Sequence, residues 1–152
     1  MFRPGRSRRP MDDIEKEQAE RFDEAIRLFD AEEFFACHDV LEELWSETYS
    51  ESRDFLQGLI HAAVALFHFG EGNLSGARKM YESHVRYLKP YLPSYAGLDL
   101  TGFERAMEDC FAELIHAGRE YPHGARLPSD RIPRLSGFRQ PPLPDSSGPP
   151  LL

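Results

Sequence analysis

One helical segment of the sequence carries a histidine and a glutamate four residues apart, His38 and Glu42. On a helix this spacing places both side chains on one face, which Trp45 shares because it follows His38 by seven residues. That face is the apolar one, so we expect the imidazole and the carboxylate to approach the core together, where each needs a polar partner. The pattern fits a metal site, an acid–base pair, or a buried polar contact that only fixes the helix register. It is not the HExxH motif of zinc peptidases, because Glu42 stands where the second histidine would be.

A second polar series lies on a segment that is otherwise apolar, at Gln57, His61 and His68. On a helix these residues trace one narrow polar track. Such a track is costly unless it meets polar partners, and His38 and Glu42 on the preceding helix are the candidates. The sequence therefore predicts an internal polar pocket, formed by His38, Asp39, Glu42, Trp45, Gln57, His61 and His68.

Other residues with chemical potential form weaker patterns. Glu113 and His116 have the spacing of a di-iron ligand pair, but such a site needs two of these pairs and further carboxylates, so a solvated helix face is expected. Cys37 and Cys110 lack the spacing of a disulfide framework or a zinc ribbon and are expected to be buried filler. His84 has no evident partner in the sequence.

Helical periodicity predicts the elements that position these residues. Five helices are expected, at about residues 12–31, 32–48, 52–69, 74–88 and 101–117. The third helix is apolar nearly all round and should be central. A turn at residues 70–73 should lead into the fourth helix as its antiparallel partner. The inward residues of that fourth helix are expected to be Ala77, Tyr81, Val85 and Leu88. Thr101 is expected to cap the fifth helix. No strand-like alternation is present, so the fold class is all-α, a compact four- to five-helix bundle with antiparallel helix hairpins.

Charge and length exclude several classes of protein. The 152-residue chain has the length of one ordinary domain and a net charge of −8. Residues 12–119 hold 23 acidic and 10 basic side chains, which argues against a nucleic-acid-binding surface because such a surface needs Lys and Arg to neutralise phosphates. No apolar run approaches the roughly 18 residues of a membrane span. With its two cysteines unpaired, we expect a reduced cytoplasmic protein without nucleic-acid or membrane partners.

The two ends of the chain differ from this acidic middle part. Residues 1–10 contain four arginines and no acid, so residues 1–11 are expected to form a disordered basic N-terminal tail, with Met11 as an alternative initiator. Residues 120–152 contain eight of the twelve prolines and are expected to form an extended or disordered C-terminal tail. Residues 12–119 then form the helical bundle domain.

A combination of motifs carries a family resemblance over about residues 22–90. The motifs are His38-Asp39-x-x-Glu42-x-x-Trp45, the run from Phe55 to His61, His68, Gly72-Asn73 and Gly76-Ala77. In this combination the chain resembles the uncharacterised family catalogued as domain of unknown function 309. The resemblance implies a compact all-α fold and no established activity. Asp39 replaces the glutamate of that family, and His61 replaces a glutamine, which is a poor ligand for transition metals, so a metal site using His61 would be particular to this chain.

These observations leave three hypotheses for the role of the pocket. The favoured one is a binding or interaction module that holds a small ligand, a basic protein partner or a second copy of itself. The partner version rests on charge, since residues 12–54 hold 16 acids and 4 bases, whereas residues 71–89 hold 2 acids and 4 bases. The alternative is a hydrolase-like, metal-dependent enzyme for small substrates, in which His38 and His61 bind a divalent metal and Glu42 is a ligand or general base. In the third, the pocket is purely architectural.

Overall fold

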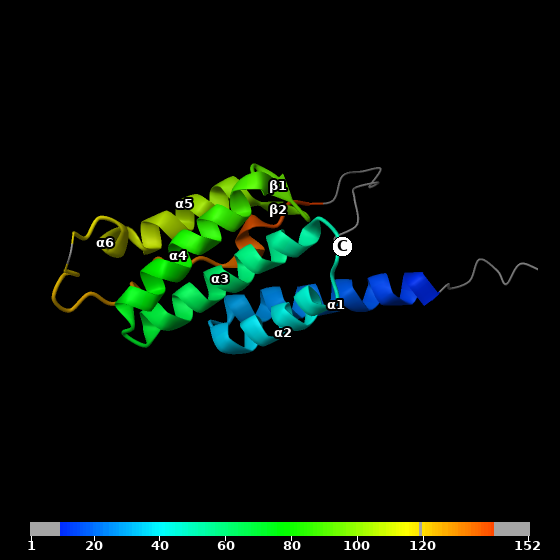
Figure 1. Ribbon diagram of the computed structural model, residues 1–152, viewed down its shortest axis with the longest axis horizontal. Coiled ribbons are helices and arrows are strands. Elements are labelled where there is room, and N and C mark those ends of the chain that lie inside the picture. Colours follow the sequence, from blue (N-terminus) through cyan, green and yellow to red (C-terminus); the bar gives the residue numbers. More distant parts are fainter. Residues whose placement is uncertain (1–9, 119, 142–152) are drawn as a thin grey trace, which may run out of the picture.

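The computed structural model describes residues 10–118 and 120–141, the first five of them by their backbone alone. Helices account for most of this part of the chain, and the predicted all-α bundle with antiparallel hairpins is confirmed (Figure 1). The α-helices are α1 (Pro10–Asp30), α2 (Phe34–Ser46), α3 (Ser52–Gly70), α4 (Leu74–Leu88), α5 (Leu100–Cys110) and α6 (Ala112–Ile115). Two 3-10 helices, η1 (Lys89–Tyr91) and η2 (Leu135–Phe138), and a two-residue hairpin, β1 (Ser94–Tyr95) with β2 (Leu98–Asp99), complete the fold. No helix of the described chain combines the length and the apolar character needed to cross a membrane.

Helix α3 occupies the centre of the fold, as its apolar circumference predicts, with α2 packed on one side and α4 on another. Gly58 allows α4 to come close, because a Cβ at this position would lie 2.5 Å from the Leu88 side chain. The side chain of Asn73 caps α4 by accepting a hydrogen bond from the Gly76 N–H at 3.0 Å, and Gly72 supplies the positive φ of the preceding turn. The hairpin of α3 and α4 is therefore specified by local residues.

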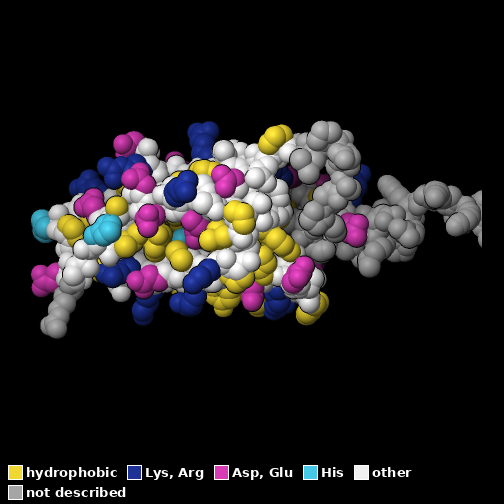
Figure 2. Space-filling model, turned by 90° about the horizontal axis from the view of Figure 1, so that it is seen from above, with side chains coloured by type: hydrophobic (Ala, Val, Ile, Leu, Met, Phe, Trp, Pro, Cys, Tyr) yellow, Lys and Arg dark blue, Asp and Glu magenta, His cyan; other side chains and the backbone are white. Residues whose placement is uncertain are grey.

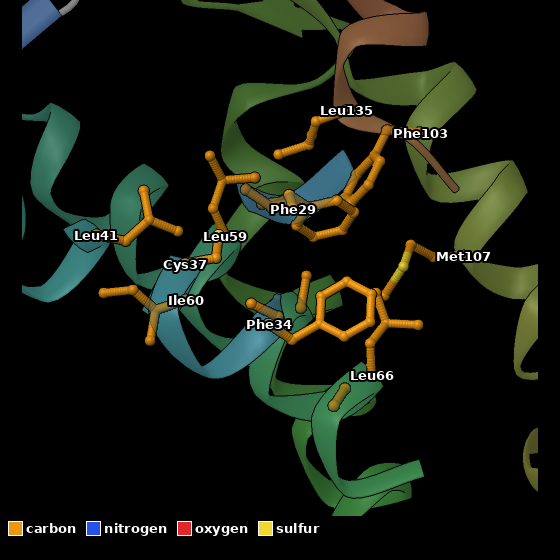
Figure 3. Packing of buried hydrophobic residues seen from close by; sticks show 14 of the residues in the cluster. Phe29, Phe34, Cys37, Leu41, Leu59, Ile60, Leu66, Phe103, Met107 and Leu135 are labelled. Atoms are coloured by element: carbon orange, nitrogen blue, oxygen red, sulfur yellow. The ribbon is translucent and has the colours of Figure 1, made fainter. Parts of the chain in front are cut away.

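The hydrophobic core joins α3 to the elements around it (Figure 3). The Phe29 ring of α1 meets the Phe34 ring of α2 at 5.3 Å between centroids and the Phe103 ring of α5 at 5.9 Å, both edge to face. Leu135, from the segment after the last α-helix, lies beside Phe29 and Phe103 and is fully buried. This core therefore includes residues from both ends of the described chain.

The start and end of the fifth predicted helix differ from expectation. Asp99 caps α5 by accepting a hydrogen bond from the Gly102 N–H at 3.0 Å, so the prediction that Thr101 is the cap is wrong. Both residues are good N-caps, and the hairpin of β1 and β2 places Asp99 at the helix entrance. The predicted single helix to Ala117 is interrupted at Phe111, after which α6 forms one short turn.

The C-terminal segment from residue 120 to residue 141 runs mostly without regular secondary structure, and part of it packs on the bundle. Besides the buried Leu135, the Ser136 N–H donates to Asp30 of α1 at 3.3 Å, and Arg139 pairs with Asp23 at 2.5 Å. The hydrophobic core thus extends beyond residue 119, where the sequence suggested the bundle domain ends. The predicted tails at residues 1–9 and 142–152 lie outside the described residues.

Substitution of Leu135 tests whether this segment is part of the folded unit. Leu135→Ala is expected to lower the free energy of unfolding by about 2–4 kcal/mol, because it leaves a cavity beside two buried phenylalanine rings. Chemical denaturation of the full chain measures this value. Leu92→Ala, the same change at an exposed position, should cost within about 0.5 kcal/mol. Equal effects of the two substitutions would contradict the role of Leu135.

Candidate functional site

The predicted contact between His38 and Glu42 forms, but it lies at the surface of α2. His38 Nδ1 is 3.2 Å from an Asp39 carboxylate oxygen, and His38 Nε2 is 3.2 Å from Glu42 Oε1. The Glu42 side chain is 54% exposed, so the expectation that it approaches the core is wrong. The reason is that α2 has two helical stripes one residue apart, and the core takes the one formed by Phe34, Cys37, Leu41 and Leu44. His38 lies at the edge of the buried stripe.

The polar track on α3 finds its main partner on α4. The Gln57 amide nitrogen lies 2.8 Å from His61 Nε2, and His61 Nδ1 lies 2.7 Å from the Ser83 hydroxyl. Because an amide NH₂ can only donate, His61 Nε2 accepts and Nδ1 carries the proton that it donates to Ser83. This pattern requires a neutral imidazole, which agrees with the lowered pKa of His61. Burial is the largest cause of the lowering, and the neighbouring His84 and Arg86 add to it. Glu42 is near enough to have a smaller, opposite influence on that pKa.

The predicted pocket residues therefore divide into separate groups. His38 contacts Asp39 and Glu42 on α2, and the pair Gln57 and His61 faces α4. Trp45 packs under the guanidinium of Arg53, whose carbon lies 3.7 Å from the ring centroid and which also donates to the Trp45 carbonyl oxygen at 3.2 Å. His68 Nδ1 lies 3.4 Å from the Asn73 amide nitrogen, at the end of α3.

A small pocket between α2 and α3 brings His38 and His68 back together. This α2/α3 pocket has a volume of about 130 Å³ and is lined by Phe34, Phe35, His38, Val64, Phe67 and His68. The Phe35 ring lies 5.4 Å from the Phe67 ring and 5.5 Å from the His38 ring, yet it is 57% exposed. The pocket is thus an apolar depression with two imidazoles among its walls, which suits an apolar group better than an ion.

The geometry gives no support to a three-ligand metal site at His38, Glu42 and His61. In the part of the chain that the structure describes, no group of three or more His, Cys, Asp or Glu side chains is placed to hold a metal ion. Both ring nitrogens of His61 already have partners, the Gln57 amide and the Ser83 hydroxyl. The hypothesis of a hydrolase-like enzyme that uses a divalent metal at these residues is therefore not supported by their geometry.

The two cysteines occupy the core, as expected. Cys37 and Cys110 are buried and form no disulfide with each other. Burial raises the pKa of each thiol to about 12, so neither is a thiolate near neutral pH. They serve as packing residues and do not contribute a nucleophile to the candidate site.

His84 was missed by reasoning from the sequence, which found no partner for it. It is 0% exposed, its Nδ1 hydrogen-bonds the Tyr81 carbonyl oxygen, and its Nε2 lies 2.6 Å from Glu104 Oε2 on α5. A signal was present, since Tyr81, His84 and Leu88 follow the same i, i+3, i+7 spacing as a buried stripe. The expectation that Val85 faces inward is wrong, because Val85 is exposed.

The fold and the site together describe a small all-α protein with an apolar pocket on the central hairpin of α2 and α3. Residues 22–80 match the model of the family described as Domain of unknown function (DUF309), which confirms the resemblance seen in the motifs. All residues that line the α2/α3 pocket lie within this matched part, whereas His84 and Glu104 lie outside it.

Two curated proteins show similarity to the chain. "Uncharacterized protein YpuF" of Bacillus subtilis (strain 168) is 32% identical over 68 residues, which are 44% of this chain and 39% of that protein. An "Uncharacterized protein" of Aquifex aeolicus (strain VF5) is 27% identical over 93 residues, 60% of this chain and 28% of that protein. The matched part of the chain therefore spans well under half the length of either relative.

The substitution His61→Gln tests the neutral state of His61. Because the folded chain lowers the pKa of His61, the unfolded chain binds a proton there more readily, and stability falls as the pH drops through about 6.5 towards the folded-state pKa. Glutamine takes up no proton, so the loss of unfolding free energy between pH 7.5 and pH 5 should be smaller in the variant. Denaturation at both pH values measures it. His116→Gln, at an exposed position, should retain the wild-type loss, and an unchanged loss in His61→Gln would contradict the assignment.

Proposed function

We propose that this protein is an interaction module whose α2/α3 pocket receives an apolar side chain from a basic protein partner. The observation that carries the proposal is the position of Phe35, a large apolar ring left 57% exposed beside Phe67 at this pocket. Exposed aromatic rings beside a depression are typical of binding hot spots, where an anchor side chain excludes water from both partners.

The size of the pocket favours a partner's side chain over a free small molecule. Pockets that enclose drug-sized ligands measure roughly 300–1,000 Å³. The α2/α3 pocket has about 130 Å³, close to the ~150 Å³ cavity that holds a benzene-sized group. One leucine, methionine or phenylalanine side chain is therefore the matching occupant.

The charges around the pocket favour a basic partner. Asp39, Glu42 and Glu43 are exposed on α2, and Glu32 and Glu33 are exposed directly before it. The part of the chain from residue 12 to residue 54 has four times as many acids as bases. Lysine or arginine residues flanking the anchor would meet opposite charges, which speeds association and sets the orientation of the partner.

Selection of peptides from a random displayed library on the immobilised full chain tests the proposal. The expected consensus is one large apolar residue flanked by lysine or arginine. Binding of the selected peptides should weaken about tenfold or more on Phe35→Ser, which corresponds to about 1.4 kcal/mol, and should also weaken with added salt.

Tyr49→Ser is the matched control, because Tyr49 is an even more exposed aromatic residue, 85% exposed, and lies outside the pocket. Selected peptides should bind this variant like the wild type. Equal losses on both variants would show that the peptides recognise exposed aromatic surface in general. An acidic consensus, or peptides indifferent to Phe35→Ser, would refute the proposed pocket.

A further inference from the structure

A second and larger pocket lies between α4 and α5, outside the part of the chain that matches the family. Its volume is about 410 Å³, within the range of small-molecule sites. The face that carries α5 and the hairpin shows apolar side chains gathered along its middle, with acidic and basic side chains around them (Figure 2). We call this depression the α4/α5 pocket and define its ends by Tyr81 and Glu108 on one side and Lys89 and Thr101 on the other.

The first end presents unused hydrogen-bond acceptors. The Tyr81 side chain lines this end, although only 8% of the residue is exposed. Glu104 and Glu108 line the same pocket, and burial, together with these two carboxylates, raises the pKa of the Tyr81 phenol. Glu104 uses Oε2 for His84, and its Oε1 accepts nothing from the described part of the chain. Tyr81, Glu104 and Glu108 therefore line this end of the pocket, where Glu104 Oε1 is free to accept a hydrogen bond.

The contact of Glu104 with His84 holds one proton in place. The Tyr81 carbonyl oxygen can only accept, so His84 Nδ1 donates to it. A proton must then also lie between His84 Nε2 and Glu104 Oε2, which are 2.6 Å apart. This contact fixes the Glu104 carboxyl group so that Oε1 remains available. This fixed acceptor and the charge of Glu108 together favour a ligand with several N–H donors, such as a primary ammonium group.

The second end of the pocket is basic. Helices α4 and α5 run in opposite directions, joined by the short connection of η1, β1 and β2 (Figure 1). By their order along these two helices, Lys89 lies towards Thr101 while Tyr81 lies towards Glu108. Lys89 follows Tyr81 by eight residues, about 12 Å along a helix. Arg105, the residue after Glu104, adds a second cation near the middle of the lining, and the apolar side chains of Val85 and Leu92 also line the pocket.

We propose that the α4/α5 pocket binds a small aliphatic zwitterion, a primary amine joined by a short alkyl chain to an anionic group. The ammonium group is held by the Tyr81 hydroxyl, Glu104 Oε1 and Glu108. The alkyl chain lies on the apolar side chains of Val85 and Leu92, and the anionic group pairs with Lys89. The site is independent of the α2/α3 pocket and of the function proposed for it.

Titration of the ¹⁵N-labelled full chain with 6-aminohexanoate tests the proposal, with hexanoate and hexylamine as the two half-ligands. We expect saturable amide shifts centred on residues 81, 85, 104 and 108 with 6-aminohexanoate. Each half-ligand should bind at least about tenfold more weakly, because it satisfies one end of the pocket only. No saturable shifts at these residues, or hexanoate binding as tightly as the zwitterion, would overturn the proposal.

The substitution Glu108→Gln keeps the size of the side chain and removes the charge at the acceptor end. It should weaken 6-aminohexanoate about tenfold and leave the binding of hexanoate unchanged. Asp109→Asn, the same loss of charge on the next and exposed residue of α5, is the matched control and should not alter either affinity. Because Glu108 is itself exposed, the amide spectrum of the variant should retain the wild-type pattern away from the pocket. Equal affinity of Glu108→Gln and the wild type would overturn the assignment of the ammonium site.

Discussion

Helix α3 must be covered on nearly every side, and the rest of the structure follows from that requirement. Its apolar circumference is buried by α2 and α4, and Gly58 lets Leu88 of α4 approach closer than any side chain would permit. Only one narrow strip of α3 stays partly accessible, and the polar residues Gln57 and His61 lie on it. Polar side chains on a strip between two covering helices need hydrogen-bond partners within the protein. Gln57 and His61 hydrogen-bond each other, and His61 also hydrogen-bonds Ser83.

Helix α4 links this strip to the other side of the fold through two neighbouring residues. Ser83 faces α3, where its hydroxyl accepts a hydrogen bond from His61, whereas His84 faces α5, where it contacts Glu104. Successive helical positions differ by about 100° in direction, so two adjacent polar side chains can serve two different neighbours. Both side chains are buried, and each polar contact is completed only when a second helix is packed in place. Of the two pockets, one lies between α2 and α3 and the other between α4 and α5, so the hairpin of α3 and α4 borders both.

The contacts of the candidate site that could be predicted are those within one helix. The approach of His38 to Glu42, the approach of Gln57 to His61 and the capping by Asn73 all follow from helical geometry, which sets the distance between residues three or four apart. Which stripe of a helix is buried was harder to predict. On α2 the sequence predicts both Leu41 and Glu42 inward, and only Leu41 is buried, whereas on α4 it predicts Val85 inward and the core takes His84.

The sequence by itself determined the all-α class, the positions of the four long helices, the central place of α3 and the turn into α4, because hydrophobic periodicity and local caps act over a few residues. Only the tertiary structure decided the partners of His61 and His84, the cap at Asp99, and the burial of Leu135 beside residues more than thirty positions away. These features depend on how each helix is rotated about its axis when the whole core closes. That rotation is set by the packing of many side chains at once and is not written in any one segment.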